Sequence, residues 1–121
     1  MTNKFVAVEG CTLTLSSGTA VSVKITTPAS TTDKASKKGI YFGTLTVSIQ
    51  GFTSEKIDAG GIGIGVLNPT ANYVNSHGQK VVRVDDVSEQ ITVTGTKSGN
   101  PATDIITVKI SNAGQNKVKA A

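Results

Sequence analysis

Apolar and polar residues alternate with a period of two along most of the chain. Because successive side chains of a β-strand point to opposite faces, this alternation predicts strands with one buried and one wet face. The period of 3.6 that indicates amphipathic helices is nearly absent. The alternating segments are 4–10, 11–18, 20–27, 44–51, 79–86, 89–96 and 104–111.

Turn-forming residues separate these segments. The connectors contain Gly or an Asn-Pro step, and none is followed by an N-cap and an amphipathic repeat long enough for a helix. They read SSGT, SKKG, SHGQ, KSGNPAT and NAGQ. The sequence therefore predicts an all-β fold of short antiparallel hairpins in a single domain over residues 1–121.

A faint internal repeat relates two parts of the chain. Residues 27–53 and 68–96 both begin with a polar residue and Pro, then pass through a Gly turn into alternating strands. Residues 100–120 are a shorter echo of the same pattern. Repeated hairpins favour radial or stacked packing. Alternating β sequences also resemble one another by default, so a true repeat and a chance likeness both stay open.

The segment 59–70, AGGIGIGVLNPT, has three interpretations. A dinucleotide site needs Gly-x-Gly-x-x-Gly opening a helix, and neither the last Gly nor the helix is present. A flexible linker would leave the apolar residues in water, which forgoes about 1.5–3 kcal/mol for each. We favour a strand whose glycine side lets another backbone approach closely. We expect its apolar residues to contact the core or a partner protein, and these residues are Ile62, Ile64, Val66 and Leu67.

The composition adds mainly exclusions. The net charge is +4 with 12 Lys and Arg, yet only one of these is Arg, so we expect no nucleic-acid partner. Lys34, Lys37 and Lys38, and a tail with Lys117 and Lys119, are interpreted as solvated charges. No apolar run approaches the roughly 20 residues that cross a bilayer, and the first ten residues lack the apolar region of a signal peptide.

Candidate chemistry is sparse. Cys11 and His77 are the only residues of their types, and nothing marks a third group that would orient them as a catalytic pair. A structural zinc site needs four Cys or His ligands, and the chain offers two. Asp85, Asp86 and Glu89 lack the spacing of a calcium loop. We therefore predict no catalytic residue, no metal ligand and no cofactor.

Residues 78–86, GQKVVRVDD, resemble the signature of PAAR-repeat proteins, the spike-tip proteins of contractile injection systems. The signature commonly reads Asn-Gly-Lys-Pro-Ala-Ala-Arg-Val-Gly-Asp. Lys80 stands at the proline, Val81 and Val82 at the alanines, and Asp85 at the second glycine. The matching residues are Gly78, Arg83, Val84 and Asp86.

This resemblance implies a PAAR-like spike tip in which three hairpin units converge with pseudo-threefold symmetry into a compact cone. Such a tip caps a trimeric spike protein, VgrG-like or from a phage, aids membrane puncture and sometimes carries effector cargo. It would contact the target membrane only transiently. It would be cytoplasmic during assembly and then part of a virion, tailocin or secretion particle. The family's zinc is held near the apex by His and Cys; this chain lacks those histidines, so no metal ligand is carried over.

Two other classes remain. A phage capsid decoration protein or tail structural protein with a β-sandwich fold would share the composition and the strand pattern. It would be present in many copies per particle, whereas a spike tip is present once per trimer. A small enzyme or a carbohydrate-binding module is less favoured, since sugar sites usually present exposed aromatic side chains and aromatic residues are only 4% of the chain.

Overall fold

The computed structural model describes residues 3–72 and 78–120, which form strands and no helix. The predicted all-β fold is therefore confirmed. No helix in the described part is long and apolar enough to cross a membrane. The strands are β1 (Lys4–Phe5), β2 (Thr12–Leu15), β3 (Ser22–Ile25), β4 (Lys34–Ala35), β5 (Lys38–Gly39), β6 (Leu45–Phe52), β7 (Ala59–Leu67), β8 (Ile91–Lys97), β9 (Asn100–Ile106), β10 (Val108–Asn112) and β11 (Lys119–Ala120).

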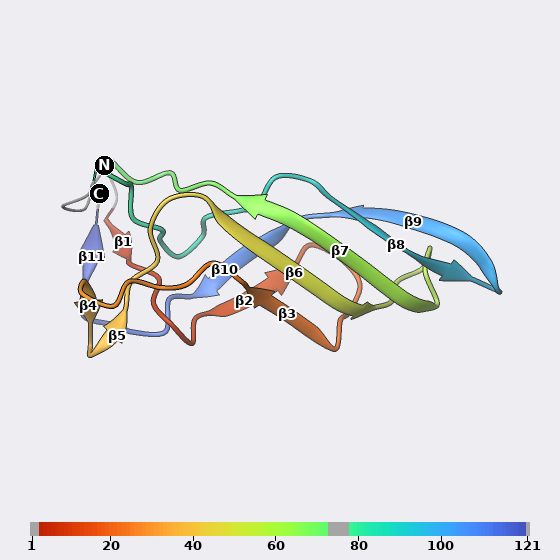
Figure 1. Cartoon of the computed structure of the whole chain (residues 1–121), viewed down its shortest axis with the longest axis horizontal. Coiled ribbons are helices and arrows are strands. Elements are labelled where there is room, and N and C mark those ends of the chain that lie inside the picture. Colours follow the sequence, from red (N-terminus) through yellow and green to blue (C-terminus); the bar gives the residue numbers. More distant parts are fainter. Residues whose placement is uncertain (1–2, 73–77, 121) are drawn as a thin grey trace.

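The largest unit is a five-stranded antiparallel sheet in the order β3-β6-β7-β8-β9. Its strands run along the length of an elongated molecule (Figure 1). The alternation in β6 directs three side chains into the core, where all three are fully buried. Their burial stabilises the fold because it removes apolar surface from water. They are Leu45, Val47 and Ile49.

A second layer covers the inner face of this sheet. After Ile106 the chain leaves β8, and from Val108 it pairs with β2 instead, so β2 and β10 form a separate antiparallel pair. Their inward side chains share one hydrophobic cluster with β6 and β8. The alternation across residues 106–110 is nevertheless continuous, since its apolar positions are all buried: Ile106, Val108 and Ile110.

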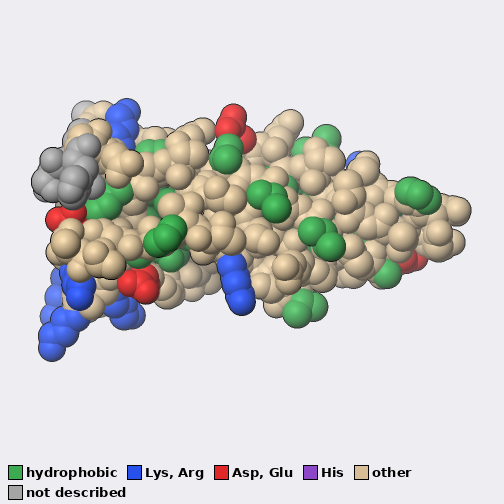
Figure 2. Space-filling view, in the orientation of Figure 1, with side chains coloured by type: hydrophobic (Ala, Val, Ile, Leu, Met, Phe, Trp, Pro, Cys, Tyr) green, Lys and Arg blue, Asp and Glu red, His purple; other side chains and the backbone are tan. Residues whose placement is uncertain are grey.

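The two ends of the molecule differ. β1 pairs with β11 and β4 pairs with β5 at a blunt end, where both chain termini lie (Figure 1). A smaller hydrophobic cluster fills this end, built around Val6, Val8, Ile40 and Val81. The opposite end narrows to the turn between β8 and β9, as the space-filling view shows (Figure 2). The fold is thus a tapered body with a small second core at its wide end.

Three predicted segments differ from the structure, and in the first, residues 4–10, only Lys4–Phe5 is a strand. Residues 79–86 form no ladder; they make isolated bridges such as Phe42 to Val81, because both faces of this segment are buried by different neighbours. Residues 97–103 were predicted to be a connector, yet β9 already begins at Asn100. The turn needs only Ser98 and Gly99, both with positive φ, and Pro101 is tolerated because β9 is an edge strand.

The described strands do not form three equivalent hairpins. One sheet has five strands and the other three have two each. The two long repeat segments end in β6 and β8, which flank β7, but these strands have different outer partners, β3 and β9. The tapered all-β body agrees with the expectation, whereas its topology differs from a threefold arrangement.

Candidate functional site

The glycine-rich segment forms β7 at the centre of the large sheet. Gly61 and Gly63 are buried on its inner side. A Cβ on Gly63 would lie 3.0 Å from Val93 Cγ2, and one on Gly65 would overlap the side chain of Ile91. Real Cβ atoms are essentially never found as close as the contact at Gly65, and the contact at Gly63 is tighter than most, so the interpretation as a close-packing strand is confirmed for this side of β7.

The backbones of β7 and β8 also approach closely. A Cβ on Gly95 would lie 3.0 Å from Gly61 Cα and 2.7 Å from Ile57 Cγ2. The two strands pair only over the first part of β7, at Ala59 with Thr96 and Ile62 with Thr94. Farther along, Ile91 packs over Gly65 instead of pairing beside it. The bare glycine side therefore lets β8 cross over β7 towards the narrow end.

The four apolar residues predicted for core or partner contact divide between two environments. Leu67 is fully buried in the main core, and Val66 is half-buried. Ile62 and Ile64 lie on the outer side of the sheet and are 57% and 69% exposed. Thr94, which pairs with Ile62, and Ser48, which pairs with Ile64, surround them with polar side chains. Only the two isoleucines are available to a partner.

The signature residues build a turn at the blunt end. The Asp86 N–H donates to the Arg83 carbonyl at 3.2 Å, which closes the turn, and Asp85 lies within it at φ 73°. Gly78 has φ 78°. Both positions are in the left-handed region that favours glycine. Asp85 stands where the family signature has its second glycine, so its backbone has the geometry that a glycine would adopt.

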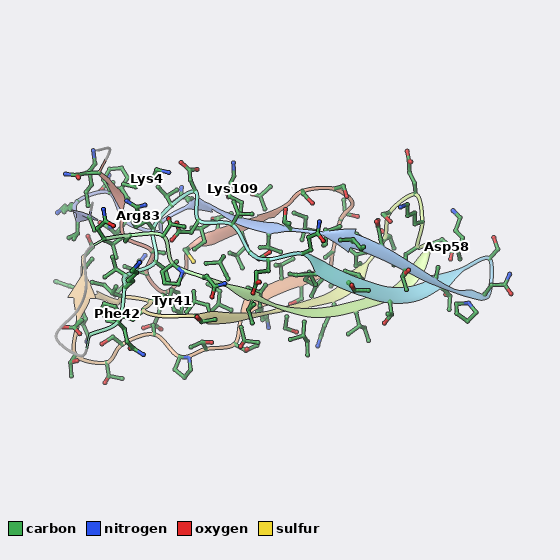
Figure 3. All side chains as sticks on the ribbon, turned by 90° about the horizontal axis from the view of Figure 1, so that it is seen from above. Lys4, Tyr41, Phe42, Asp58, Arg83 and Lys109 are labelled. Atoms are coloured by element: carbon green, nitrogen blue, oxygen red, sulfur yellow. The ribbon has the colours of Figure 1, made fainter. Side chains whose placement is uncertain are left out.

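Arg83 and Asp86 are 8% and 2% exposed, and their hydrogen bonds link segments that are far apart in the sequence. The Asp86 carboxylate accepts the Arg83 N–H at 2.9 Å and the Thr70 hydroxyl. The Arg83 guanidinium donates to Thr70 Oγ1 at 3.1 Å and to the Ala120 carbonyl at 3.3 Å. Figure 3 shows Arg83 inside the wide part of the molecule, near Tyr41 and Phe42. Sequence reasoning missed Thr70 and Ala120, because nothing in the signature points to residues so distant in the chain.

The candidate nucleophile lies in a setting unsuited to thiolate chemistry. Cys11 is half-buried and packs against the main core. Burial raises its pKa to about 11, although a backbone hydrogen bond at Cys11 opposes this, so the thiol is protonated at neutral pH. Burial also raises the pKa of nearby Tyr41, with smaller contributions from Cys11 and Glu9. His77, the other half of the pair, lies outside the described residues.

The acidic candidates are not brought together. Asp85 is exposed and its Oδ2 lies 3.8 Å from Lys4 Nζ, while Asp86 is buried in the turn. Glu89 Oε2 accepts a hydrogen bond from Asn68 Nδ2 at 3.3 Å. Within residues 3–72 and 78–120 no group of three His, Cys, Asp or Glu side chains is placed to hold a metal ion.

A hollow of about 860 Å³ lies beside the loop between β6 and β7. Its two aspartates already have partners: Asp104 Oδ2 accepts from Ser54 Oγ at 2.7 Å, and Asp58 Oδ2 accepts from the Ser98 N–H at 2.8 Å. Asp58 lies towards the narrow end (Figure 3). These contacts tie that end together and leave the two aspartates engaged within the fold.

Comparison of the chain with family models, with curated proteins and with solved structures gives no match.

Proposed function

We propose that this chain is a PAAR-like tip protein, which caps the trimeric spike of a contractile injection system and aids membrane puncture. The observation that carries the proposal is the tapered all-β body, in which β8 crosses the glycine side of β7 towards a narrow end. A tip needs one narrow end that leads and a wider body that its support can hold. Both termini lie at the broad end, so a fused effector would be carried there.

The signature region supports the same proposal. Gly78 and Asp85 both have positive φ, as the glycines of the signature would. Arg83 and Asp86 hold the turn to Thr70 and to the last described residue, Ala120. The positive φ of Gly78 and Asp85 and the hydrogen bonds of Arg83 and Asp86 therefore give these four positions a structural role that needs no metal.

Under this proposal Ile62 and Ile64 contact the spike. Both are exposed, so replacing them leaves the core intact, and an acidic side chain there would oppose burial in an interface. We expect Ile64→Asp to remain folded and to lose co-purification with the spike. The matched control is Thr12→Asp, which adds the same charge to an exposed polar position on β2, in the other layer. Unchanged co-purification of Ile64→Asp with the spike would contradict this interface.

One observation favours a second candidate, a capsid decoration or tail structural protein. Ile62, Ile64 and Ile105 are exposed on the sheet, which is the flank of the tapered body and not its broad end. Exposed apolar residues on a flank suit side-to-side packing of many copies. Quantitative mass spectrometry of purified particles separates the candidates: a tip gives one copy for three spike chains, whereas a decoration or tail protein gives many.

A further inference from the structure

The blunt end contains a second hollow, of about 580 Å³, between the loop before β4 and strand β11. Its floor is apolar and belongs to the smaller hydrophobic cluster, with Val6, Ile40 and Val81. Phe42 is half-buried and also lines the hollow. Figure 3 shows Phe42 at the blunt end. A cavity of this size accommodates one or two side chains of another molecule.

One wall holds a carboxylate oxygen without a partner. Asp33 Oδ2 is buried and accepts no hydrogen bond from the described residues. Its backbone is fixed, because the Asp33 N–H donates to Ser30 Oγ at 2.9 Å and its carbonyl accepts from the Ile40 N–H at 3.0 Å. This oxygen is closed to solvent, so contacts within the hollow are left to the apolar floor and the rim.

The rim of the hollow is positively charged. Lys34 and Lys119 line it, and the one ion pair among the described residues joins Lys4 to Asp85, so Asp33 forms no ion pair with either lysine. The Lys119 ammonium lies 4.7 Å from the centre of the Phe5 ring. Blue side chains gather at this end in Figure 2. The lysines of β1, β11, the β4–β5 hairpin and the residues just before β11 are Lys4, Lys34, Lys37, Lys38, Lys117 and Lys119.

We propose that this hollow is a docking site for an acidic segment of a partner protein, whose apolar side chain enters it. The floor takes the apolar side chain, and the rim lysines attract the flanking carboxylates. Phosphate-bearing partners fit less well, because a phosphate group brings no apolar side chain to cover the floor. The docking site does not depend on the proposed function. Its apolar floor and lysine rim would select an acidic segment whether the chain is a spike tip or a decoration protein.

The test uses isotope-labelled protein and short blocked peptides as probes, followed by NMR. The acidic probe has a central leucine with two acidic residues on each side. One control probe replaces the leucine by glycine, and another replaces the acids by lysines. We expect saturable shifts at Asp33, Lys34, Phe42 and Lys119 with the acidic leucine probe, weaker binding of the glycine probe and none of the lysine probe.

Two variants keep the proposal falsifiable. Lys34→Glu combined with Lys119→Glu should weaken binding of the acidic probe by roughly tenfold and create binding of the lysine probe. Lys24→Glu with Lys97→Glu is the matched control, because both lysines are exposed on β3 and β8, away from the hollow. Thr32→Trp should fill the hollow from its exposed rim and abolish binding without a charge change.

Several results would overturn the proposal. They are peptide shifts outside the blunt end, equal effects of the two double variants, or no effect of Thr32→Trp in protein with an unchanged circular dichroism spectrum. Tight binding to a DNA duplex or to vesicles of phosphatidylglycerol, with no binding of the acidic leucine probe, would also overturn it and would assign the lysines to a phosphate-bearing partner.

Discussion

Gly65 and Ile91 occupy neighbouring space in the core, and only the missing side chain of the glycine permits their contact. Gly63 has the same relation to Ile91 and Val93 at slightly larger separations. Ile62 and Ile64, which alternate with the glycines of β7, point the other way, into solvent. At this scale the residue type is set by what lies opposite each position, and not by the flexibility of glycine.

Replacing Gly65 with Ala should destabilise the fold, because the new methyl group overlaps Ile91 in a packed interior. We expect a loss of about 1–3 kcal/mol in the free energy of unfolding. Urea denaturation followed by circular dichroism measures it. Thr94→Ala, on the exposed side of β8, should change the value by less than about 0.5 kcal/mol. Equal values for the two variants would mean that β8 does not cross β7 at this contact.

The raised pKa of Cys11 predicts a pH dependence of stability. The thiol pKa is raised from 9.0 to about 11 by burial, so the folded state holds its proton more tightly than the unfolded state. This contribution is complete below pH 9 and is lost as the pH rises towards 11. Stability should therefore fall between pH 9 and pH 11 by less in Cys11→Ala than in the unmodified chain, as thermal unfolding across this range would show. An identical fall in both proteins would place the thiol in water.

Two hairpins at opposite ends of the molecule use the same turn. Ser98 and Gly99 join β8 to β9, and Ser36 and Lys37 join β4 to β5; all four residues have positive φ. Two-residue turns with both φ values positive match the twist of the strands they join. The sequence showed each turn by its glycine or polar residues, but it did not show how short each turn would be.

Ser98→Asn should stabilise the protein, because Asn is strongly preferred to Ser at the first position of this turn. We expect a gain of roughly 0.5 kcal/mol, measured by urea denaturation. Ser22→Asn is a control on the edge strand β3, at a position with no turn. A loss of stability in Ser98→Asn would show that the Ser98 side chain has a role that the turn geometry does not explain.

Strands with one apolar face were predictable, and segments with two buried faces were not. The alternation at Leu45, Val47 and Ile49 gave the core side of β6 correctly. Around Arg83 it failed, because Val81 and Val82 are both buried although they point to opposite sides. The partners of Arg83 are Thr70 and Ala120, and such contacts depend on the tertiary fold and leave no local pattern.

At the scale of the whole molecule, residues 3–72 and 78–120 form two hydrophobic cores of unequal size. The larger lies between the five-stranded sheet and the β2–β10 pair. The smaller lies at the blunt end and includes Ala120 of β11, whose carbonyl also accepts from Arg83. The small cluster depends on the last strand, whereas the large one does not include it. Local stability should therefore differ between the two ends.

Removing residues 119–121 should loosen the blunt end and spare the large sheet. The deletion removes the β1–β11 pairing and the acceptor for Arg83. Hydrogen exchange measured by mass spectrometry should show faster exchange in residues 4–8 and 81–84, with β6, β7 and β8 still protected. Removal of residue 121 alone is the control. Loss of protection throughout the chain would show that the two cores unfold as one unit.

The lengthwise course of β6, β7 and β8 has a mechanical consequence. Hydrogen bonds of an antiparallel ladder lie perpendicular to the strands. A push on the narrow turn between β8 and β9 is therefore directed along the strands and shears many of these bonds at once. A pull on the two termini would instead peel open the two residue pairs of β1 and β11 in turn. The molecule is built to withstand compression along its axis better than tension between its ends.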